Sequence, residues 1–160
     1  LNDPTYWGDQ AYSVLGQSDS AIVGYSIVNA RLAAHKDSTD SDRNVIVREG
    51  TLVDNKPAFP IVNILQGEGA IGPYSFGYLG TEPLFLTKLG VYAITAQDIT
   101  GEKYSQSRSF FLNGKLLEEN GLEEAFALVY KDMYWLCLNG RAYILDGLQA
   151  TQTDRSAPVS

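Results

Sequence analysis

Two stretches of the sequence resemble copies of one β-hairpin, and this pair constrains the fold more than any other feature. The copies occupy residues 84–94 and 134–144. In each, an apolar strand leads through a tight turn with a glycine into a second strand rich in aromatic and β-branched residues. The two glycines, Gly90 and Gly140, are 50 residues apart (140 − 90 = 50). Repeats at such an interval are typical of propeller blades and solenoid coils.

A third and weaker copy lies upstream. There, an apolar segment at residues 25–36 leads through an acidic turn at 37–43 into a strand at 44–48, and Lys36 precedes Lys88 by 52 residues (88 − 36 = 52). The sequence therefore predicts one β-rich domain at residues 1–149, with about three blade-like repeats at 20–65, 72–113 and 123–149. Residues 150–160, rich in Thr, Gln and Ser, are expected to form a linker or a disordered tail.

The expected fold class is mainly β, with antiparallel meander repeats of propeller-blade type. One short helical connector is expected at residues 115–121, where good helix formers precede Asn120-Gly121. In the third repeat the last strand of a four-stranded meander is unaccounted for. The expected strands are 21–28, 31–35, 44–49 and 58–65 in the first repeat, 74–79, 84–88, 91–96 and 109–112 in the second, and 125–130, 133–138 and 141–145 in the third.

Composition excludes several classes of protein. The 160 residues are 44% hydrophobic and 11% aromatic, as expected of a packed, strand-rich protein. A net charge of −7 disfavours nucleic acid as a partner, because binding to phosphate backbones needs clustered Lys and Arg. The sequence has no run of about 18 apolar residues, so no membrane span is predicted, and no signal peptide is recognisable. The single cysteine, Cys137, lies in an apolar strand and is expected to be a small buried hydrophobe.

One motif resembles half of a dinucleotide-binding fingerprint. Residues 67–72 match G-x-G-x-x-G and follow the apolar strand 61–65. A helix should open at the glycines, but Pro73 and the strand-like residues 74–78 follow, and Glu68 would place a carboxylate where phosphate must lie. The expected structure is a turn between two repeats.

Metal sites and cofactors are not expected. Asp37, Asp40 and Asp42 place oxygen ligands as the start of a calcium loop does, but Val45 and Thr51 stand where that loop needs Gly and Glu. A solvated hairpin turn is the favoured interpretation, and calcium binding by the three aspartates stays open. His35 is the only histidine, so a usual zinc site lacks ligands.

No constellation of catalytic residues is evident either, and the chain is expected not to be an enzyme. His35 would have to be the base for a serine nucleophile, yet no G-x-S-x-G elbow is present. A glycosidase pair would have to come from an acidic cluster on a polar connector, where carboxylates are usually solvated. The repeated aspartate boxes of propeller sialidases are absent. The cluster comprises Glu118, Glu119, Glu123 and Glu124.

The aromatic residues could line a sugar-binding surface or a protein interface, since both favour flat amphipathic rings. Apolar residues occupy both faces of strands 126–130 and 134–138, so these strands are expected to be covered on both sides and most of the aromatic residues to be core. The set consists of Tyr74, Phe76, Tyr78, Tyr92, Tyr130, Tyr134, Trp135 and Tyr143.

The run at residues 80–95, GTEPLFLTKLGVYAIT, together with residues 98–109 and 145–149, resembles structural proteins of tailed bacteriophages, including phages of gut bacteria. These are tail or stabilisation proteins, and the likeness covers roughly residues 2–149. It implies a virion component with propeller-like blades, assembled in the host cytoplasm, and it carries no catalytic residues. Such proteins are longer than 160 residues, so this chain is expected to be part of one. Its start at Leu1 fits a processed protein, a trimmed chain or a fragment.

The favoured interpretation is a non-enzymatic virion protein that acts through interfaces with other virion proteins or with further copies of itself. A propeller-type glycan-binding module and an acid-pair glycoside hydrolase stay as alternatives. Closed propellers need about four to eight blades, so a chain with three should associate or belong to a larger protein.

Overall fold

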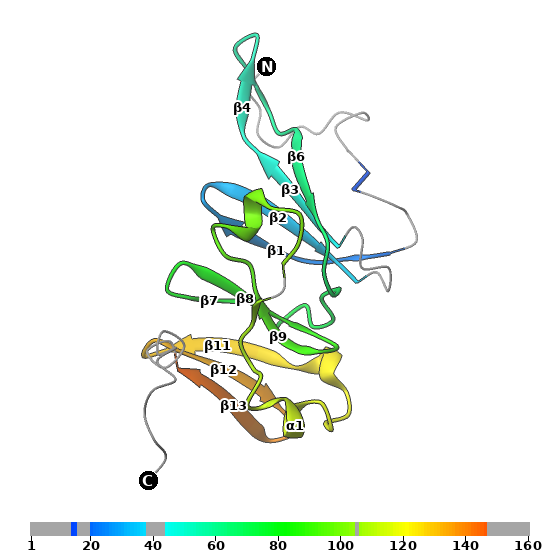
Figure 1. Cartoon of the computed structure of the whole chain (residues 1–160), viewed down its shortest axis with the longest axis vertical. Coiled ribbons are helices and arrows are strands. Elements are labelled where there is room, and N and C mark those ends of the chain that lie inside the picture. Colours follow the sequence, from blue (N-terminus) through cyan, green and yellow to red (C-terminus); the bar gives the residue numbers. More distant parts are fainter. Residues whose placement is uncertain (1–13, 16–19, 38–43, 105, 147–160) are drawn as a thin grey trace, which may run out of the picture.

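The computed structural model describes residues 14–15, 20–37, 44–104 and 106–146. They form a mainly β structure in which three antiparallel sheets follow one another along the long axis of the molecule, in chain order (Figure 1). The first sheet has the order β1-β2-β3-β6, the second β7-β8-β9-β10 and the third β11-β12-β13. The strands are β1 (Ile22–Val28), β2 (Arg31–Lys36), β3 (Val45–Glu49), β6 (Ile61–Leu65), β7 (Gly77–Leu79), β8 (Glu82–Thr87), β9 (Gly90–Ala93), β10 (Gln106–Ser107), β11 (Phe126–Tyr130), β12 (Met133–Leu138) and β13 (Arg141–Asp146).

A two-stranded arm interrupts the first sheet between β3 and β6. It consists of β4 (Thr51–Val53) and β5 (Lys56–Ala58), and it projects from one end of the molecule (Figure 1). Its two turn residues, Asp54 and Asn55, have φ of 50° and 60°, which suits a tight hairpin. The sequence pattern missed this arm, because its strands have three residues each and one of them contains Pro57.

The second strand of each sheet recurs at a constant interval. The strands β2, β8 and β12 start at residues 31, 82 and 133 and end at 36, 87 and 138, so each step is 51 residues. A two-residue turn precedes each of them, because Val28 pairs with Arg31, Leu79 with Glu82 and Tyr130 with Met133. All three hairpins anticipated from the sequence are the second and third strands of their sheets.

The spacing of 50 residues between Gly90 and Gly140 is one residue shorter than the spacing of the strands β8 and β12. Gly90 belongs to β9, where it pairs with Thr87, whereas Gly140 lies within the turn that joins Leu138 to Arg141. The two glycines meet different needs. Gly90 has a φ of 117° beside crowded side chains, whereas Gly140 has a φ of 72° in an open turn, where a Cβ would have no atom within 4 Å.

Replacing Gly90 with alanine is expected to lower the free energy of unfolding by about 1–3 kcal/mol. A Cβ there would lie 2.4 Å from Asn113 Oδ1 and 2.5 Å from Ser109 Oγ, and the positive φ adds strain. Gly114→Ala is the control, since Gly114 lies in a helix with nothing within 4 Å. Urea unfolding of both variants measures the difference, and equal stabilities would contradict the crowding at Gly90.

The second sheet is covered on both faces. Because side chains alternate along a strand, Phe85 points toward the first sheet and Leu84 and Leu86 point toward the third. Phe85 packs in one core with Ala33, Val45 and Val47 of the first sheet. The second core joins Leu84 and Leu86 to side chains of the third sheet, among them Tyr134 and Leu136.

The segment that resembled a dinucleotide fingerprint is the link between the first and second sheets. No helix opens after it, because Pro73 and Tyr74 form a turn and β7 begins at Gly77. Gly67 has a φ of 155° and lies against the ring of Tyr104, where a Cβ would clash. Farther on, the Ala70 amide donates to the Lys36 carbonyl. The expectation of a turn, rather than a nucleotide-binding helix, after these glycines is therefore confirmed.

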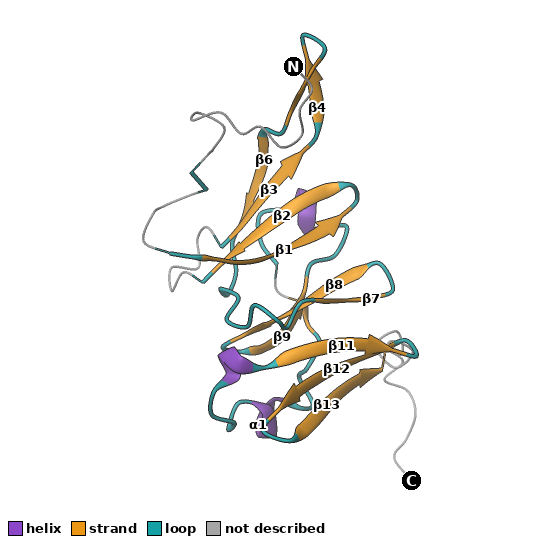
Figure 2. Cartoon of the chain, turned by 180° about the vertical axis from the view of Figure 1, so that it is seen from behind, coloured by secondary structure: helices purple, strands orange, loops and turns teal. Residues whose placement is uncertain are grey.

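The connector before the third sheet differs in detail from the expectation. The helix α1 (Asn113–Leu116) has four residues, and a 3-10 turn at Leu122–Glu124 follows Gly121, whose φ is 71° (Figure 2). The strand expected at 109–112 is absent, since Ser109 instead accepts a hydrogen bond from the Val91 amide and donates one to Asn113 Oδ1. The fourth strand of the second sheet is β10, three residues earlier than expected at its start.

Candidate interaction surfaces

The outer face of the third sheet is apolar, and no other described element packs on it. We call it the C-terminal face. Rows across the sheet, such as Leu128-Trp135-Ile144, are set by strand pairing, while the alternating residues Tyr134 and Leu136 point into the core. Its most exposed members are between 41% and 56% exposed. The face consists of Phe126, Leu128, Tyr130, Met133, Trp135, Cys137, Ala142 and Ile144, with Asp146 at its border.

The outer face of the first sheet is also largely apolar, but it carries Arg48 in one row and, at its edge, the buried Lys36, whose Nζ donates to the Leu15 carbonyl. We call it the N-terminal face. Pairing places its side chains in two rows that cross all four strands. Ala34 and Ile46, at its centre, are buried, whereas the apolar side chains around them are between 39% and 57% exposed. The exposed members are Tyr25, Ile27, Leu32, Ile61 and Ile64.

The 51-residue interval relates the C-terminal face to the interior of the stack. Trp135 and Cys137 correspond to Leu84 and Leu86 in the second sheet, which contribute to the core between the second and third sheets. The same positions in the first sheet are Ala33 and His35, and both are fully buried. The C-terminal face thus has the composition and position of a surface that another sheet covers in the rest of the chain.

One expectation from the sequence is wrong for the third sheet. Strands β11 and β12 were expected to be covered on both sides, but only one face of this sheet is covered by the described chain. Of the aromatic residues expected in the core, Tyr134 is fully buried, whereas Tyr74, Tyr78 and Tyr130 are exposed. Cys137, expected to be buried, is partly exposed on the C-terminal face. An apolar composition on both faces does not say which molecule supplies the second layer.

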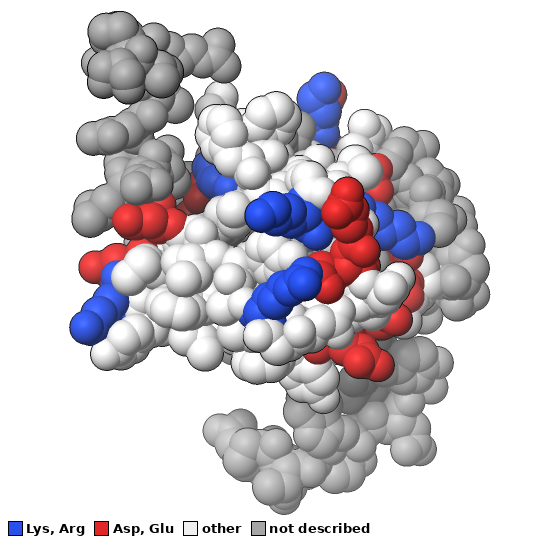
Figure 3. All heavy atoms as spheres, turned by 90° about the horizontal axis from the view of Figure 1, so that it is seen from below, with Lys and Arg blue, Asp and Glu red and all other residues white. Residues whose placement is uncertain are grey.

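Charged residues leave much of this end of the molecule uncovered. Figure 3 looks at the molecule from below and shows a broad area of uncharged residues beside a band in which basic and acidic side chains alternate. One ion pair near the third sheet joins Arg141 to Glu119 at 2.8 Å. The surface is suited to contact with another apolar protein surface rather than with a polyanion.

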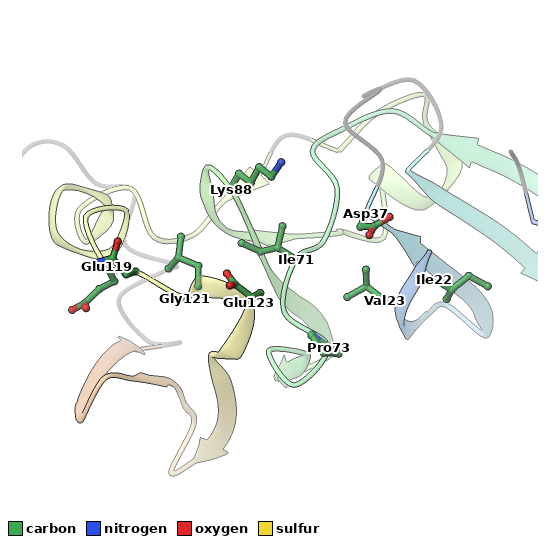
Figure 4. A pocket seen from close by; sticks show the side chains of 11 residues that line it. Ile22, Val23, Asp37, Ile71, Pro73, Lys88, Glu119, Gly121 and Glu123 are labelled. Carbon is green, nitrogen blue, oxygen red and sulfur yellow. The ribbon is translucent and has the colours of Figure 1, made fainter. Parts of the chain in front are cut away.

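A groove of about 680 Å³ runs along one side of the stack, from the start of β1 past Lys88 to the connector (Figure 4). The carboxylates of Asp37, Glu119 and Glu123 are spread along it and do not converge (Figure 4). Within the described ranges, no group of three or more His, Cys, Asp or Glu side chains is arranged to hold a metal ion. The groove therefore offers neither a carboxylate pair at a cleft floor nor a metal centre among these residues.

Glu119 has a structural role. Its carboxylate accepts hydrogen bonds from Asn139 Nδ2, Arg141 Nη1 and Tyr143 Oη at 2.9, 2.8 and 2.8 Å, which ties the connector to the third sheet. The hydrogen bond from Asn139, followed by that from Tyr143, lowers the pKa of Glu119. A general acid in a glycosidase needs a raised pKa, so Glu119 is unsuited to that role.

A serine and the single histidine do meet, but inside the core. Ser26 Oγ lies 2.6 Å from His35 Nε2, and both residues are buried. The imidazole ring packs against Phe76 and Phe85, with ring centroids 5.0 and 4.5 Å away. Burial lowers the pKa of His35 to about 3. Because no solvent reaches the pair, it holds β1 and β2 together and is not a nucleophile site.

Replacing Ser26 with alanine is expected to lower the free energy of unfolding by about 1–3 kcal/mol, because the buried imidazole loses its hydrogen bond. The double variant Ser26→Ala/His35→Leu is the control, since it removes both polar partners and places at 35 the residue type found at the equivalent Leu86. It should recover most of the loss in urea unfolding. A double variant as unstable as the single one would contradict this role.

The calcium-like motif falls largely outside the described ranges, which exclude Asp40 and Asp42. The carboxylate of Asp37 accepts a hydrogen bond from the Ala21 amide at 2.8 Å and thereby anchors the start of β1. As for membranes, the part of the chain that the structure describes has no helix long and apolar enough to cross a bilayer.

In comparisons with known proteins, no family model, no curated protein and no solved structure matches this chain.

Proposed function

We propose that this chain is a non-enzymatic structural or assembly protein of a tailed-phage virion, made of propeller-type sheets, and that it works through protein–protein interfaces. The observation that supports the proposal is the C-terminal face. Its side chains are apolar and partly exposed, whereas the side chains at the positions equivalent to Trp135 and Cys137 in the first two sheets are buried. An exposed apolar patch of this kind is typical of a protein interface.

The propeller interpretation is supported by the order of the strands. The first two sheets are four-stranded meanders, as blades are, and the third has three strands within the described residues. Consecutive sheets pack face to face through one core each. Because closed propellers need about four to eight blades, three sheets would leave both ends of the stack to be covered by other protein.

The virion assignment is supported by the resemblance of residues 80–95 and of the stretches after them to phage tail and stabilisation proteins. The partners would be other virion proteins or further copies of the chain, in a particle assembled in the host cytoplasm. The net charge of −7 argues against nucleic acid as a partner.

A glycan-binding propeller would present aromatic platforms at equivalent positions of its blades. The position of Tyr25 corresponds to Phe76 and Ala127, and the position of Tyr78 corresponds to Ile27 and Val129, at steps of 51 residues. Exposed rings do not recur at these positions. Phe59 and Phe110 are one step apart and both exposed, but Phe59 precedes β6 and Phe110 lies between β10 and α1, so they do not share one position on a sheet. The interface function is therefore favoured over carbohydrate recognition.

The direct test of the virion assignment is quantitative mass spectrometry of purified particles. We expect this chain to remain in the particle fraction after density-gradient purification, at a fixed copy number relative to the major capsid protein. Detection only in the soluble fraction of infected cells would contradict the proposal.

A further inference from the structure

We propose that the C-terminal face of one copy of this chain binds the N-terminal face of a second copy, head to tail. The inference rests on the proposed function and names the partner of that interface. The partner is a second copy because such a contact would repeat the kind of sheet-to-sheet packing that already occurs twice within the chain.

The repeat defines two kinds of sheet face. The side chains of one kind point toward the next sheet in the chain, as Leu84 and Leu86 do, and those of the other kind point toward the preceding sheet, as Phe85 and Leu136 do. In each of the two internal cores, a face of the first kind from one sheet packs against a face of the second kind from the next sheet. No other sheet among the described residues packs on the C-terminal face, which is of the first kind, or on the N-terminal face, which is of the second kind.

The internal interface also predicts which residues meet. Between the first and second sheets, the ring of His35 contacts those of Phe76 and Phe85. One step of 51 residues before these two phenylalanines leads to Tyr25 and Ala34, and two steps after His35 lead to Cys137. Of these two, only Tyr25 is exposed, so Cys137 of one copy should lie beside Tyr25 of the other.

Geometry also favours a closed assembly. Without the two-stranded β4-β5 arms, two copies hold six sheets, which falls within the range of about four to eight in which propellers close. A head-to-tail contact forms a ring when its rotation closes and a filament when it does not. Two interfaces of the same kind would then cover both apolar faces of each copy.

The first test is thiol cross-linking, which uses Cys137 as the native thiol. In the full-length Tyr25→Cys variant, a short bis-maleimide is expected to give a covalent dimer in denaturing electrophoresis. The additional substitution Cys137→Ala should abolish that band. Leu52→Cys is the matched control, because Leu52 is exposed on the β4 arm, away from both faces. A dimer band as strong in the control as in the Tyr25→Cys variant would overturn the pairing.

The second test is complementation. Leu128→Glu disables the C-terminal face and Ile27→Glu disables the N-terminal face, and both side chains are exposed, so each variant should fold. Each variant alone is expected to be monomeric in sedimentation velocity. An equimolar mixture should form a heterodimer, because one intact face of each kind remains. If either variant alone still forms dimers, or if the mixture stays monomeric, the head-to-tail contact is wrong.

The outcomes separate this inference from the proposed function. A chain that is monomeric in these assays yet present in purified particles would overturn the self-association and leave the virion assignment standing. A chain that forms the predicted dimer but is absent from particles would do the reverse.

Discussion

Replacing Phe85 with alanine is expected to lower the free energy of unfolding by about 3–5 kcal/mol, one of the two largest effects that we anticipate. Phe85 is fully buried where the first and second sheets meet. Its ring contacts those of His35, Phe76 and Tyr104, with centroids 4.5, 5.9 and 5.6 Å away. Truncation would leave a cavity between two sheets that no neighbouring element can fill without moving a strand.

The matched control is Phe111→Ala, since Phe111 is 97% exposed and its loss should change stability by less than about 0.5 kcal/mol. Urea unfolding followed by tryptophan fluorescence measures both variants. If Phe85→Ala costs no more than Phe111→Ala, the core between the first two sheets does not hold them together as described.

Acidification is expected to destabilise the protein through His35. Its pKa is lowered by burial from 6.5 to about 3, so the unfolded state binds a proton that the folded state does not between these values. Above pH 6.5, His35 is neutral in both states and does not reduce the free energy of unfolding. As the pH falls from 6.5 toward 3, the unfolded state gains the proton and the free energy of unfolding decreases. The slope approaches about 1.4 kcal/mol per pH unit, which gives a loss of about 1.5 kcal/mol between pH 6.5 and 5.

Carboxylates also titrate in acid, so the variant His35→Leu provides the reference. Between pH 6.5 and 5, the wild type should lose about 1.5 kcal/mol more of its unfolding free energy than the variant does. Urea unfolding of both proteins across this range measures the difference. Parallel pH profiles would show that His35 is not held neutral in the core.

The strands were predictable because their signals are local. Runs of apolar, aromatic and β-branched residues bounded by short turns located β1, β2, β11, β12 and β13 to within one or two residues. The spacing between equivalent strands was harder to obtain from the glycines, because Gly90 lies in a strand and Gly140 lies in a turn. Gly90 avoids a clash with Asn113, and Gly140 forms a turn. The spacing of 51 residues holds for the starts of β2, β8 and β12 rather than for the glycines.

The candidate surfaces were only half predictable. Apolar residues on both faces of β12 correctly indicated an apolar outer face, but a single sequence does not tell a second layer in the same chain from one in another molecule. The buried Ser26–His35 pair could not be anticipated either, because it depends on the register between β1 and β2. Local patterns do not fix such cross-strand contacts.

The central claim is that this stack of sheets is completed by protein contacts at its apolar end faces. Sedimentation velocity of the full chain, over a wide range of concentrations, tests it most directly. The account predicts a discrete species of twice the 17.5 kDa chain mass, which Leu128→Glu converts to monomer. A single 17.5 kDa species at every concentration, unchanged by that substitution, would contradict it.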